Sequence, residues 1–369
     1  MVEALARTPL HDEHVDLGAR MVPFAGFEMP VHYASGIVAE HRAVREAAGL
    51  FDVSHMGELE IRGPDALRLV QRVTTNDAAS LAVGQAQYSV LCQEDGGALD
   101  DCLVYRLSDR FMIVVNASTR ERDRAWIAGH VGSLDAELVD RSDDTALLAL
   151  QGPRAQEVLG AVTEHPLQEI AYYHFGEVEV AARSALVSRT GYTGEDGFEL
   201  YVAPESAGHI WRALLDAGTE LGILPAGLGA RDSLRLEMGY VLYGSDLDTA
   251  HTPLEAGLGW VVKLDKGEFV GRTALARQKQ AGIVRKLAGF RLRERGFPRQ
   301  GYAVHQQRTV IGTVTSGVLS PTLGTGIGLA YLPRDAAAAG TPIEIMIRGK
   351  AVAAEVVRPP FYTAGSIRR

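Results

Sequence analysis

Two apolar runs, residues 88–92 and 98–105, flank the dipeptide Asp95-Gly96. This pattern predicts a β-hairpin, because a tight turn needs a positive φ that glycine adopts without a Cβ clash. The second strand carries Asp100 and Asp101 side by side. Side chains alternate across a strand, so we expect the two carboxylates to point to opposite faces, and at least one to be poorly solvated. Two solvated acids near a turn are the simpler interpretation, since Asp is depleted from strands.

Apolar residues recur at helical spacing in several other segments. Ile37, Val44 and Ala47 fall on one stripe of a segment that ends at Gly49, a residue suited to a helix C-terminus. The expected helices cover residues 35–48, 64–73, 119–130 and 209–221, one that begins near Ala230, and a charged connector over residues 267–280. Residues 21–33, rich in Gly, Pro and aromatic side chains, favour an ordered but irregular segment, and residues 239–262 a mixture of loop and strand.

The pattern changes after Arg285, where short apolar strands replace helices. The expected strands are residues 287–292, 303–305, 310–315, 327–332, 343–347 and 352–357. Gly349-Lys350 is a turn signal between the last two, and Pro333 and Pro342 lie at strand ends, where a missing N–H group is tolerated. Six short strands in succession are typical of a small antiparallel barrel.

Length, charge and cysteine content narrow the possible functions. A chain of 369 residues exceeds one ordinary domain, and its net charge of −9 argues against nucleic-acid binding, which needs a cationic surface. Cys92 and Cys102 lie on adjacent predicted strands without metal-ligand spacing, which favours a reducing compartment. Residues 1–14 lack the apolar stretch of a signal peptide, and no apolar run reaches the ~18 residues of a membrane span. We therefore expect a cytoplasmic protein without membrane contact.

Three further residues could carry chemistry. Residues 186–202 predict two strands joined by a glycine-rich bend, which is not a dinucleotide-binding motif because no helix follows it. In the second of these strands Glu199 alternates with apolar residues, so its carboxylate faces away from them. Arg231 lies in the first turn of a helix, where the dipole disfavours a cation, which suggests either an anionic ligand or a surface salt bridge. His55 has no second His or Cys at ligand spacing, which favours a hydrogen-bonded structural role over an acid-base one.

Taken together, seven segments resemble the T-protein family of the glycine cleavage system, which are folate-dependent aminomethyltransferases, over essentially the whole chain. The segments are residues 21–27 (MVPFAGF), 49–56 (GLFDVSHM), 97–105 (GALDDCLVY), 149–153 (ALQGP), 191–199 (GYTGEDGFE), 230–237 (ARDSLRLE) and 312–317 (GTVTSG), the last followed by Ser320-Pro321. Each is weak alone, but their common order makes the resemblance specific.

The resemblance implies an α+β fold of three domains around a central folate site, with a C-terminal antiparallel β-barrel. In this numbering, the first domain would combine residues 1–54 with 142–262, and residues 55–141 would be an inserted unit. The barrel domain would occupy residues 281–369, after a connector at residues 263–280. The hydrophobic pattern independently predicts the inserted unit and the barrel, but not that the flanking pieces join.

The resemblance also implies a reaction and a set of site residues. The family transfers the methylene of an aminomethyl group, carried on the lipoyl arm of the H-protein, to tetrahydrofolate. The products are 5,10-methylenetetrahydrofolate, ammonia and the dihydrolipoyl carrier. By motif position, Asp100 corresponds to the catalytic aspartate, with Asp101 as a structural neighbour, and Glu199 and Arg231 match folate-binding positions. Weaker matches for the pocket are Tyr88, Asn116, Tyr192, Trp260 and, near the C-terminus, Tyr362.

Other functions stay open at this point. A folate domain of the dimethylglycine or sarcosine oxidase type would accompany a flavin domain, for which this chain has no dinucleotide motif. A folate-binding protein of iron–sulfur maintenance would carry a Lys-Gly-Cys-Tyr type motif, where this chain has Lys266-Gly267-Glu268 and no Cys. A folate binder without catalytic activity fits the motifs equally well. A basic cluster, Arg291, Arg293, Arg295 and Arg299, either steers an acidic partner or is a solvated barrel face.

Overall fold

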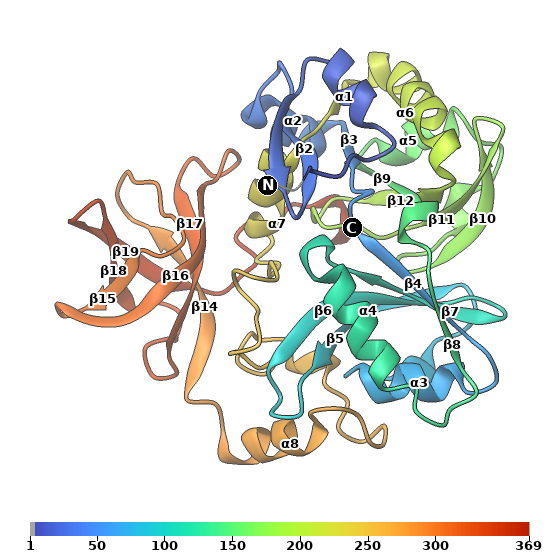
Figure 1. Cartoon of the computed structure of the whole chain (residues 1–369). Coiled ribbons are helices and arrows are strands. Elements are labelled where there is room, and N and C mark those ends of the chain that lie inside the picture. The colour runs from blue at the N-terminus through green and yellow to red at the C-terminus, as the bar shows by residue number, and fades with distance from the viewer. Residues whose placement is uncertain (1–3, 369) are drawn as a thin grey trace.

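The computed structural model describes residues 4–368 and contains three larger β-structures, each with its own hydrophobic core (Figure 1). The helices are α1 (His11–Asp16), α2 (Ile37–Glu46), α3 (Ala66–Val73), α4 (Arg120–Gly129), α5 (Ala155–Gly160), α6 (Pro204–Gly218), α7 (Leu228–Glu237) and α8 (Arg272–Ala281). None of the helices within these residues is both long enough and apolar enough to span a bilayer. The mixed α+β character expected from the sequence is confirmed.

The six-stranded sheet, at the upper right of Figure 1, combines segments that lie far apart in the chain. Its strands in spatial order are β10 (Phe175–Val180), β11 (Arg183–Ser188), β12 (Gly197–Val202), β9 (Ala146–Gln151), β3 (Ala48–Asp52) and β13 (Ile223–Pro225). β3 pairs antiparallel with β9 and parallel with β13. Leu50 therefore shares one core with Phe198 and Trp211, and the chain segments on either side of residues 57–140 fold together.

The five-stranded sheet, below it in Figure 1, is antiparallel throughout. Its strands in spatial order are β5 (Gln85–Cys92), β6 (Ala98–Arg106), β7 (Arg110–Val115), β4 (Gly57–Arg62) and β8 (Glu137–Asp140). One face packs on α3 and α4, where Leu91 and Cys102 join the core of this unit. On the opposite face, Tyr105 packs against the six-stranded sheet and Val90 against residues of the barrel. This second face lies where the three β-structures meet.

The C-terminal strands close into the barrel expected from the sequence. In spatial order they are β14 (Arg285–Leu292), β17 (Gly326–Pro333), β16 (Thr309–Leu319), β15 (Ala303–Gln306), β18 (Pro342–Ile347) and β19 (Lys350–Val357), and β19 pairs back with β14. All neighbours are antiparallel. The barrel stands apart at the left of Figure 1, with β14 and β17 on the side nearer the rest of the chain.

Two sequence expectations are wrong in detail. Residues 21–33 are not irregular: β1 (Arg20–Phe24) and β2 (Phe27–His32) form a hairpin whose turn residues, Ala25 and Gly26, both have positive φ. Residues 239–262 contain no named strand, and only an isolated bridge joins Tyr243 to Leu247. In both segments turn and loop residues dominate the composition, so the local pattern does not report the pairing.

Candidate functional site

Asp101 lies on the face of β6 that looks toward the other two β-structures. Its Oδ2 accepts a hydrogen bond from the Tyr88 hydroxyl at 2.8 Å, and its Oδ1 accepts one from Nδ2 of Asn116 at 2.9 Å. The Tyr88 ring stacks on that of Trp260, with centroids 5.9 Å apart and planes at 22°. Trp260 is 59% exposed, so this aromatic pair borders solvent. A carboxylate, a phenol, an amide and an indole therefore gather on one face of the hairpin.

The Asp101 carboxyl is tuned for proton transfer near neutral pH. Burial and the neighbouring Asp100 carboxyl raise its pKa to about 7, against hydrogen bonds from Tyr88 and Asn116 that lower it. An acid with this pKa is present in both protonation states at physiological pH, which is the property a general acid or base needs. Asp101 is therefore chemically the most suitable acid on this face.

Arg231 begins α7 close to a second aromatic pair. Its guanidinium carbon lies 4.8 Å from the ring centroid of Tyr192, which stacks on Tyr240. Within residues 4–368 this guanidinium has the cation–π contact but no hydrogen bond or ion pair. Burial lowers the pKa of Arg231, and the nearby Tyr192 and Glu199 raise it. N–H donors of a partly exposed guanidinium without a protein acceptor are suited to a carboxylate or carbonyl of a ligand.

Glu199 lies on β12 with only 8% of its surface exposed. Its Oε2 accepts a hydrogen bond from the Thr190 hydroxyl at 2.5 Å, and its Oε1 accepts none from the described residues. Burial raises the pKa of this carboxyl, and the Thr190 hydrogen bond and the charge of Arg231 lower it. Glu199 and Arg231 influence each other's titration. Strand β12 and the start of α7 therefore bring a carboxylate oxygen and guanidinium N–H groups into one region.

Asp100 points to the opposite face of β6, as the alternation of the strand predicts. It is fully buried on the side of α4, where its Oδ2 accepts hydrogen bonds from the Thr119 hydroxyl at 2.7 Å and the Asn116 backbone N–H at 3.0 Å. Tyr88, Trp260 and Tyr192 surround Asp101 rather than Asp100. Asp101, and not the acid chosen by motif position, Asp100, therefore shares a face of β6 with the aromatic residues.

Tyr362, the loosest sequence match, belongs to a different group of contacts. Its ring centroid lies 4.2 Å from the guanidinium carbon of Arg45, and the Glu195 carboxyl influences its titration. The contacts of Tyr362 do not include Asp101, Glu199 or Arg231. The other six residues that the resemblance matches are linked to one another by direct or electrostatic contacts, whereas Tyr362 contacts Arg45.

For two residues of this region the sequence did not indicate the environment that the structure shows. His55 is buried against Phe24 with ring centroids 5.6 Å apart, yet its Nδ1 has no hydrogen-bond partner within residues 4–368, contrary to the expected structural role. Burial and the charge of Arg231 lower its pKa to about 4, so its imidazole is neutral at pH 7. Asp123, on the highly charged helix α4, is fully buried. The residues next to His55 and Asp123 in the sequence do not indicate that these two side chains are buried.

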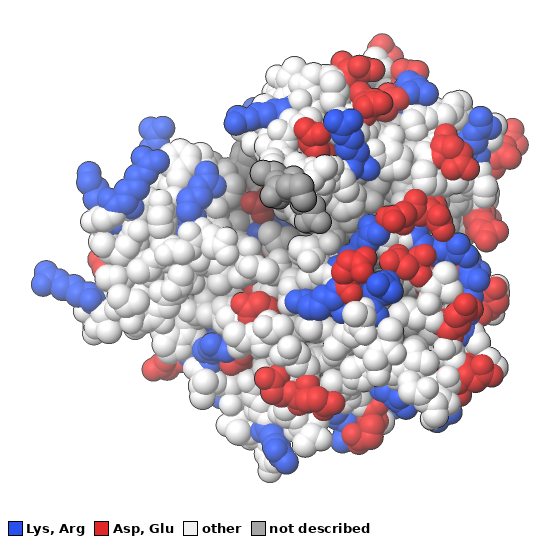
Figure 2. Space-filling model, viewed as in Figure 1, with Lys and Arg blue, Asp and Glu red and all other residues white. Residues whose placement is uncertain are grey.

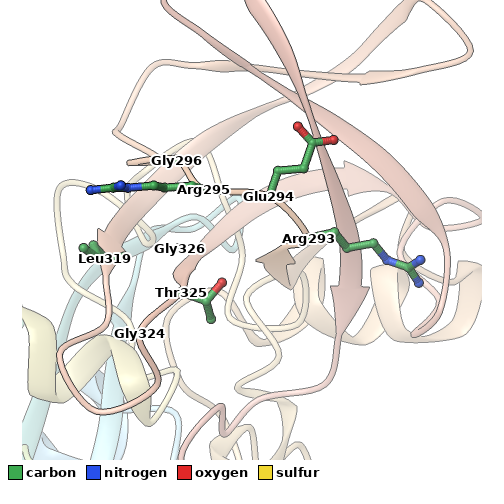
Figure 3. Close-up of a pocket in the computed structure, with 8 residues that line it drawn as sticks. All are labelled: Arg293, Glu294, Arg295, Gly296, Leu319, Gly324, Thr325 and Gly326. Atoms are coloured by element: carbon green, nitrogen blue, oxygen red, sulfur yellow. The ribbon is translucent and has the colours of Figure 1, made fainter.

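The basic cluster of the barrel lies elsewhere. Lysine and arginine side chains gather on the barrel, at the left of Figure 2. A surface hollow of about 520 Å³ there is lined by Arg293, Glu294, Arg295, Gly296, Leu319, Gly324, Thr325 and Gly326 (Figure 3). The guanidinium groups of Arg293 and Arg295 point away from each other, and Arg293 pairs with Glu355. The two cations therefore do not converge on one anion, and the hollow contains none of the residues around Asp101.

Comparisons with known proteins agree over nearly the whole chain. Residues 10–266 match the family model described as the GCVT N-terminal domain, and residues 285–363 match the glycine cleavage T-protein C-terminal barrel domain. An aminomethyltransferase of Symbiobacterium thermophilum is 54% identical over 98% of both chains, and one of Halothermothrix orenii is 49% identical over 97% of this chain and 100% of its own. The crystal structure of glycine cleavage system aminomethyltransferase T from Bartonella henselae superposes with a TM-score of 0.92 at 35% identity, covering 97% of this chain and 98% of that one.

Proposed function

The chain belongs to the glycine cleavage T-protein family and is an aminomethyltransferase, and we propose that it transfers the methylene of an aminomethyl group from the lipoyl arm of the H-protein to tetrahydrofolate. The observation that carries the proposal is the position of Asp101, an acid with a pKa of about 7 that faces an aromatic pair at the junction of the three β-structures. The expected products are 5,10-methylenetetrahydrofolate, ammonia and the dihydrolipoyl carrier.

The residues around Asp101 fit a folate. Tetrahydrofolate supplies two nucleophilic nitrogens, a pterin edge rich in N–H donors, and carboxylates. Glu199 offers its free Oε1 to the pterin donors, and Arg231 offers unpaired N–H groups to a carbonyl or carboxylate. The rings of Tyr88, Trp260 and Tyr192 form the walls. This set of an acceptor, a cation and flat apolar surfaces supports binding of the proposed substrate.

The catalytic role we propose for Asp101 follows from its hydrogen bonds and pKa. When ionised, its carboxylate stabilises positive charge that develops on the transferred methylene and accepts a proton from the attacking nitrogen. Tyr88 and Asn116 fix its two oxygens, so little reorganisation is needed during the reaction. Much of the remaining rate enhancement would come from holding the folate and the carrier-bound group in line.

The function is tested by mixing the protein with aminomethylated, lipoylated H-protein and tetrahydrofolate, and measuring ammonia and 5,10-methylenetetrahydrofolate. We expect stoichiometric release of both, dependent on tetrahydrofolate. Tetrahydrofolate binding by calorimetry without any ammonia release would instead identify a folate binder without catalytic activity. Absence of both binding and release would contradict the proposed substrate.

We expect Glu199→Gln and Arg231→Met to weaken tetrahydrofolate binding by roughly 1–3 kcal/mol each, because each change leaves a buried ligand group without its partner. Isothermal titration calorimetry measures the change. Glu177→Gln is the matched control for Glu199, since Glu177 lies in the same sheet with an exposed side chain. Unchanged affinity in both site variants would remove them from the folate site.

We also propose domain boundaries and a location. A first domain of residues 1–54 with 142–262 is supported by the pairing of β3 with β9 and β13, an inserted unit at 55–141 by the five-stranded sheet, and a third domain at 281–369 by the barrel, after a connector at residues 263–280. A cytoplasmic location is supported by Cys92 and Cys102, which are both free thiols and buried.

A further inference from the structure

A second pair of acids lies directly behind Asp101, on the α4 side of β6. Asp100 and Asp123 are both fully buried, and their carboxyl groups interact with each other. Oδ1 of Asp123 accepts a hydrogen bond from Nε of Arg122 at 3.2 Å. Its Oδ2 meets no N–H or O–H donor of residues 4–368. A proton between the two carboxyls is the one remaining donor available to this oxygen, because two bare carboxylates in contact would repel each other.

Asn116 connects this acid pair to Asp101. Its Nδ2 donates to Oδ1 of Asp100 at 2.8 Å and to Oδ1 of Asp101 at 2.9 Å, while its backbone N–H donates to Oδ2 of Asp100 at 3.0 Å. Thr119 adds a further donor to Asp100. Asp100 thus holds both the backbone and the side chain of Asn116, and the Asn116 amide in turn fixes the Asp101 carboxylate on the opposite face of the strand.

We propose that Asp100 and Asp123 share one proton, held on Asp100, and form a positioning pair that orients Asn116 and keeps a second full charge from developing beside Asp101. The inference rests on the catalytic role proposed for Asp101. Asp123 carries the negative charge of the pair, where Arg122 balances it, and Asp100 stays neutral. The charge is thereby kept on α4 and not on β6, where Asp100 directly precedes Asp101.

The electrostatic surroundings agree with this division. Burial and Asp123 together raise the pKa of Asp100 well above its ordinary value. Burial also raises the pKa of Asp123, but the contacts of Asp123 with Asp100 and Arg122 oppose that rise. Other titratable groups also face these three carboxyls. Arg122 and Tyr243 lie beside Asp123. Tyr88 and Tyr192 lie beside Asp101, and the thiols of Cys92 on β5 and Cys102 on β6 lie near the acids. Of these groups, Arg122 is the cation, and it contacts Asp123 rather than Asp100.

The proposal predicts opposite behaviour of two amide substitutions. Burial and Asp123 together favour the protonated form of Asp100, so Asp123→Asn removes one of these two effects and Asp100 ionises at a lower pH. The charge on Asp100 then moves the acid limb of kcat/KM against pH upward by about one pH unit. Asp100→Asn imitates the protonated state, so it lowers kcat less than about tenfold and leaves the limb in place. The pH profile is measured with lipoylated carrier, and tetrahydrofolate affinity is measured at one pH to confirm an intact site.

If Asp100 and Asp123 had only a structural role, their substitution would lower activity equally at every pH and would not move the acid limb of the kcat/KM profile. Glu121→Gln, on the same helix but exposed, is the matched control and leaves the profile unchanged. The proposal is overturned if Asp123→Asn leaves the limb in place, or if Asp100→Asn removes activity by 100-fold or more, which would make Asp100 the reacting acid. A wild-type protein that releases no ammonia would instead refute the proposed function, independently of this pair.

Discussion

Asp101→Asn is expected to lower kcat by about 10²- to 10³-fold, the range for loss of acid-base or electrostatic assistance from one positioned group. The substituted amide keeps the size of the side chain and one acceptor for Tyr88 or Asn116, so the fold and tetrahydrofolate binding should be retained. Single-turnover release of ammonia from the aminomethylated carrier measures the chemical step, and calorimetry measures folate affinity. Retention of more than a tenth of wild-type turnover would exclude Asp101 as the reacting acid.

The pH dependence gives an independent check on Asp101. Its pKa of about 7 means that the ionised form is a minority below pH 7 and dominates above it. If the ionised form reacts, kcat/KM rises with pH and levels off above about 7, and the residual activity of Asp101→Asn lacks this limb. A wild-type profile that is flat between pH 6 and about 8 would contradict the assignment.

The hydrophobic pattern could not show which of the two carboxylates, Asp100 or Asp101, shares a face of the hairpin with Tyr88. A plain hairpin that pairs Cys92 with Ala98 would place Tyr88 opposite Cys102, and thus on the same face as Asp100. In the structure Cys92 does pair with Ala98, but the register shifts between Leu91 and Cys92, so Tyr88 pairs with Leu103 instead. This β-bulge moves Tyr88 to the face of Asp101. One extra residue near the turn therefore decides which carboxylate meets the aromatic pair.

The sequence predicted those parts of the fold that depend on residues close together in the chain. The hairpin around Asp95-Gly96 and the closed barrel follow from turn residues and strand spacing, which act over a few positions. The insertion of β3 between β9 and β13 depends on contacts between residues about 50, 150 and 224, which no local periodicity reports. Glu199 and Arg231 were predicted by family resemblance, and their closeness in space arises from that same long-range pairing.

The second large effect is expected at Arg45, a charged residue of α2 that is buried at the meeting point of several segments. Its Nη2 and Nε donate to Oε2 of Glu237 at 2.8 and 3.0 Å, and its Nη1 donates to Oε1 of Glu195 at 2.9 Å. Glu237 also accepts hydrogen bonds from Ser320 and Thr322 in the barrel. This network therefore ties α2, α7, the glycine-rich bend and the barrel together.

Arg45→Met should destabilise the protein by about 3–5 kcal/mol, because it leaves two buried carboxylates without their cation while keeping the volume of the side chain. Urea unfolding followed by circular dichroism measures the loss. Burial alone would raise the pKa of Glu237, but hydrogen bonds and charges from His41 and Arg45 hold it at about 2, below its ordinary 4.5. A lowered pKa stabilises the folded state above about pH 4.5, and this contribution is lost as the pH falls toward 2. Wild-type stability should therefore fall more steeply than that of Arg45→Met over this interval.

Arg154→Met is the matched control for the Arg45 substitution, since Arg154 also pairs with a glutamate, Glu157, but both side chains are exposed. A solvated pair three residues apart at the start of α5 contributes little, so this control should unfold at nearly the wild-type urea concentration. If Arg45→Met also unfolds there, the buried network does not hold the segments together. If its unfolding midpoint falls while the control stays, the barrel and the folate-facing elements depend on Arg45 for their mutual position, and tetrahydrofolate affinity should fall with the midpoint.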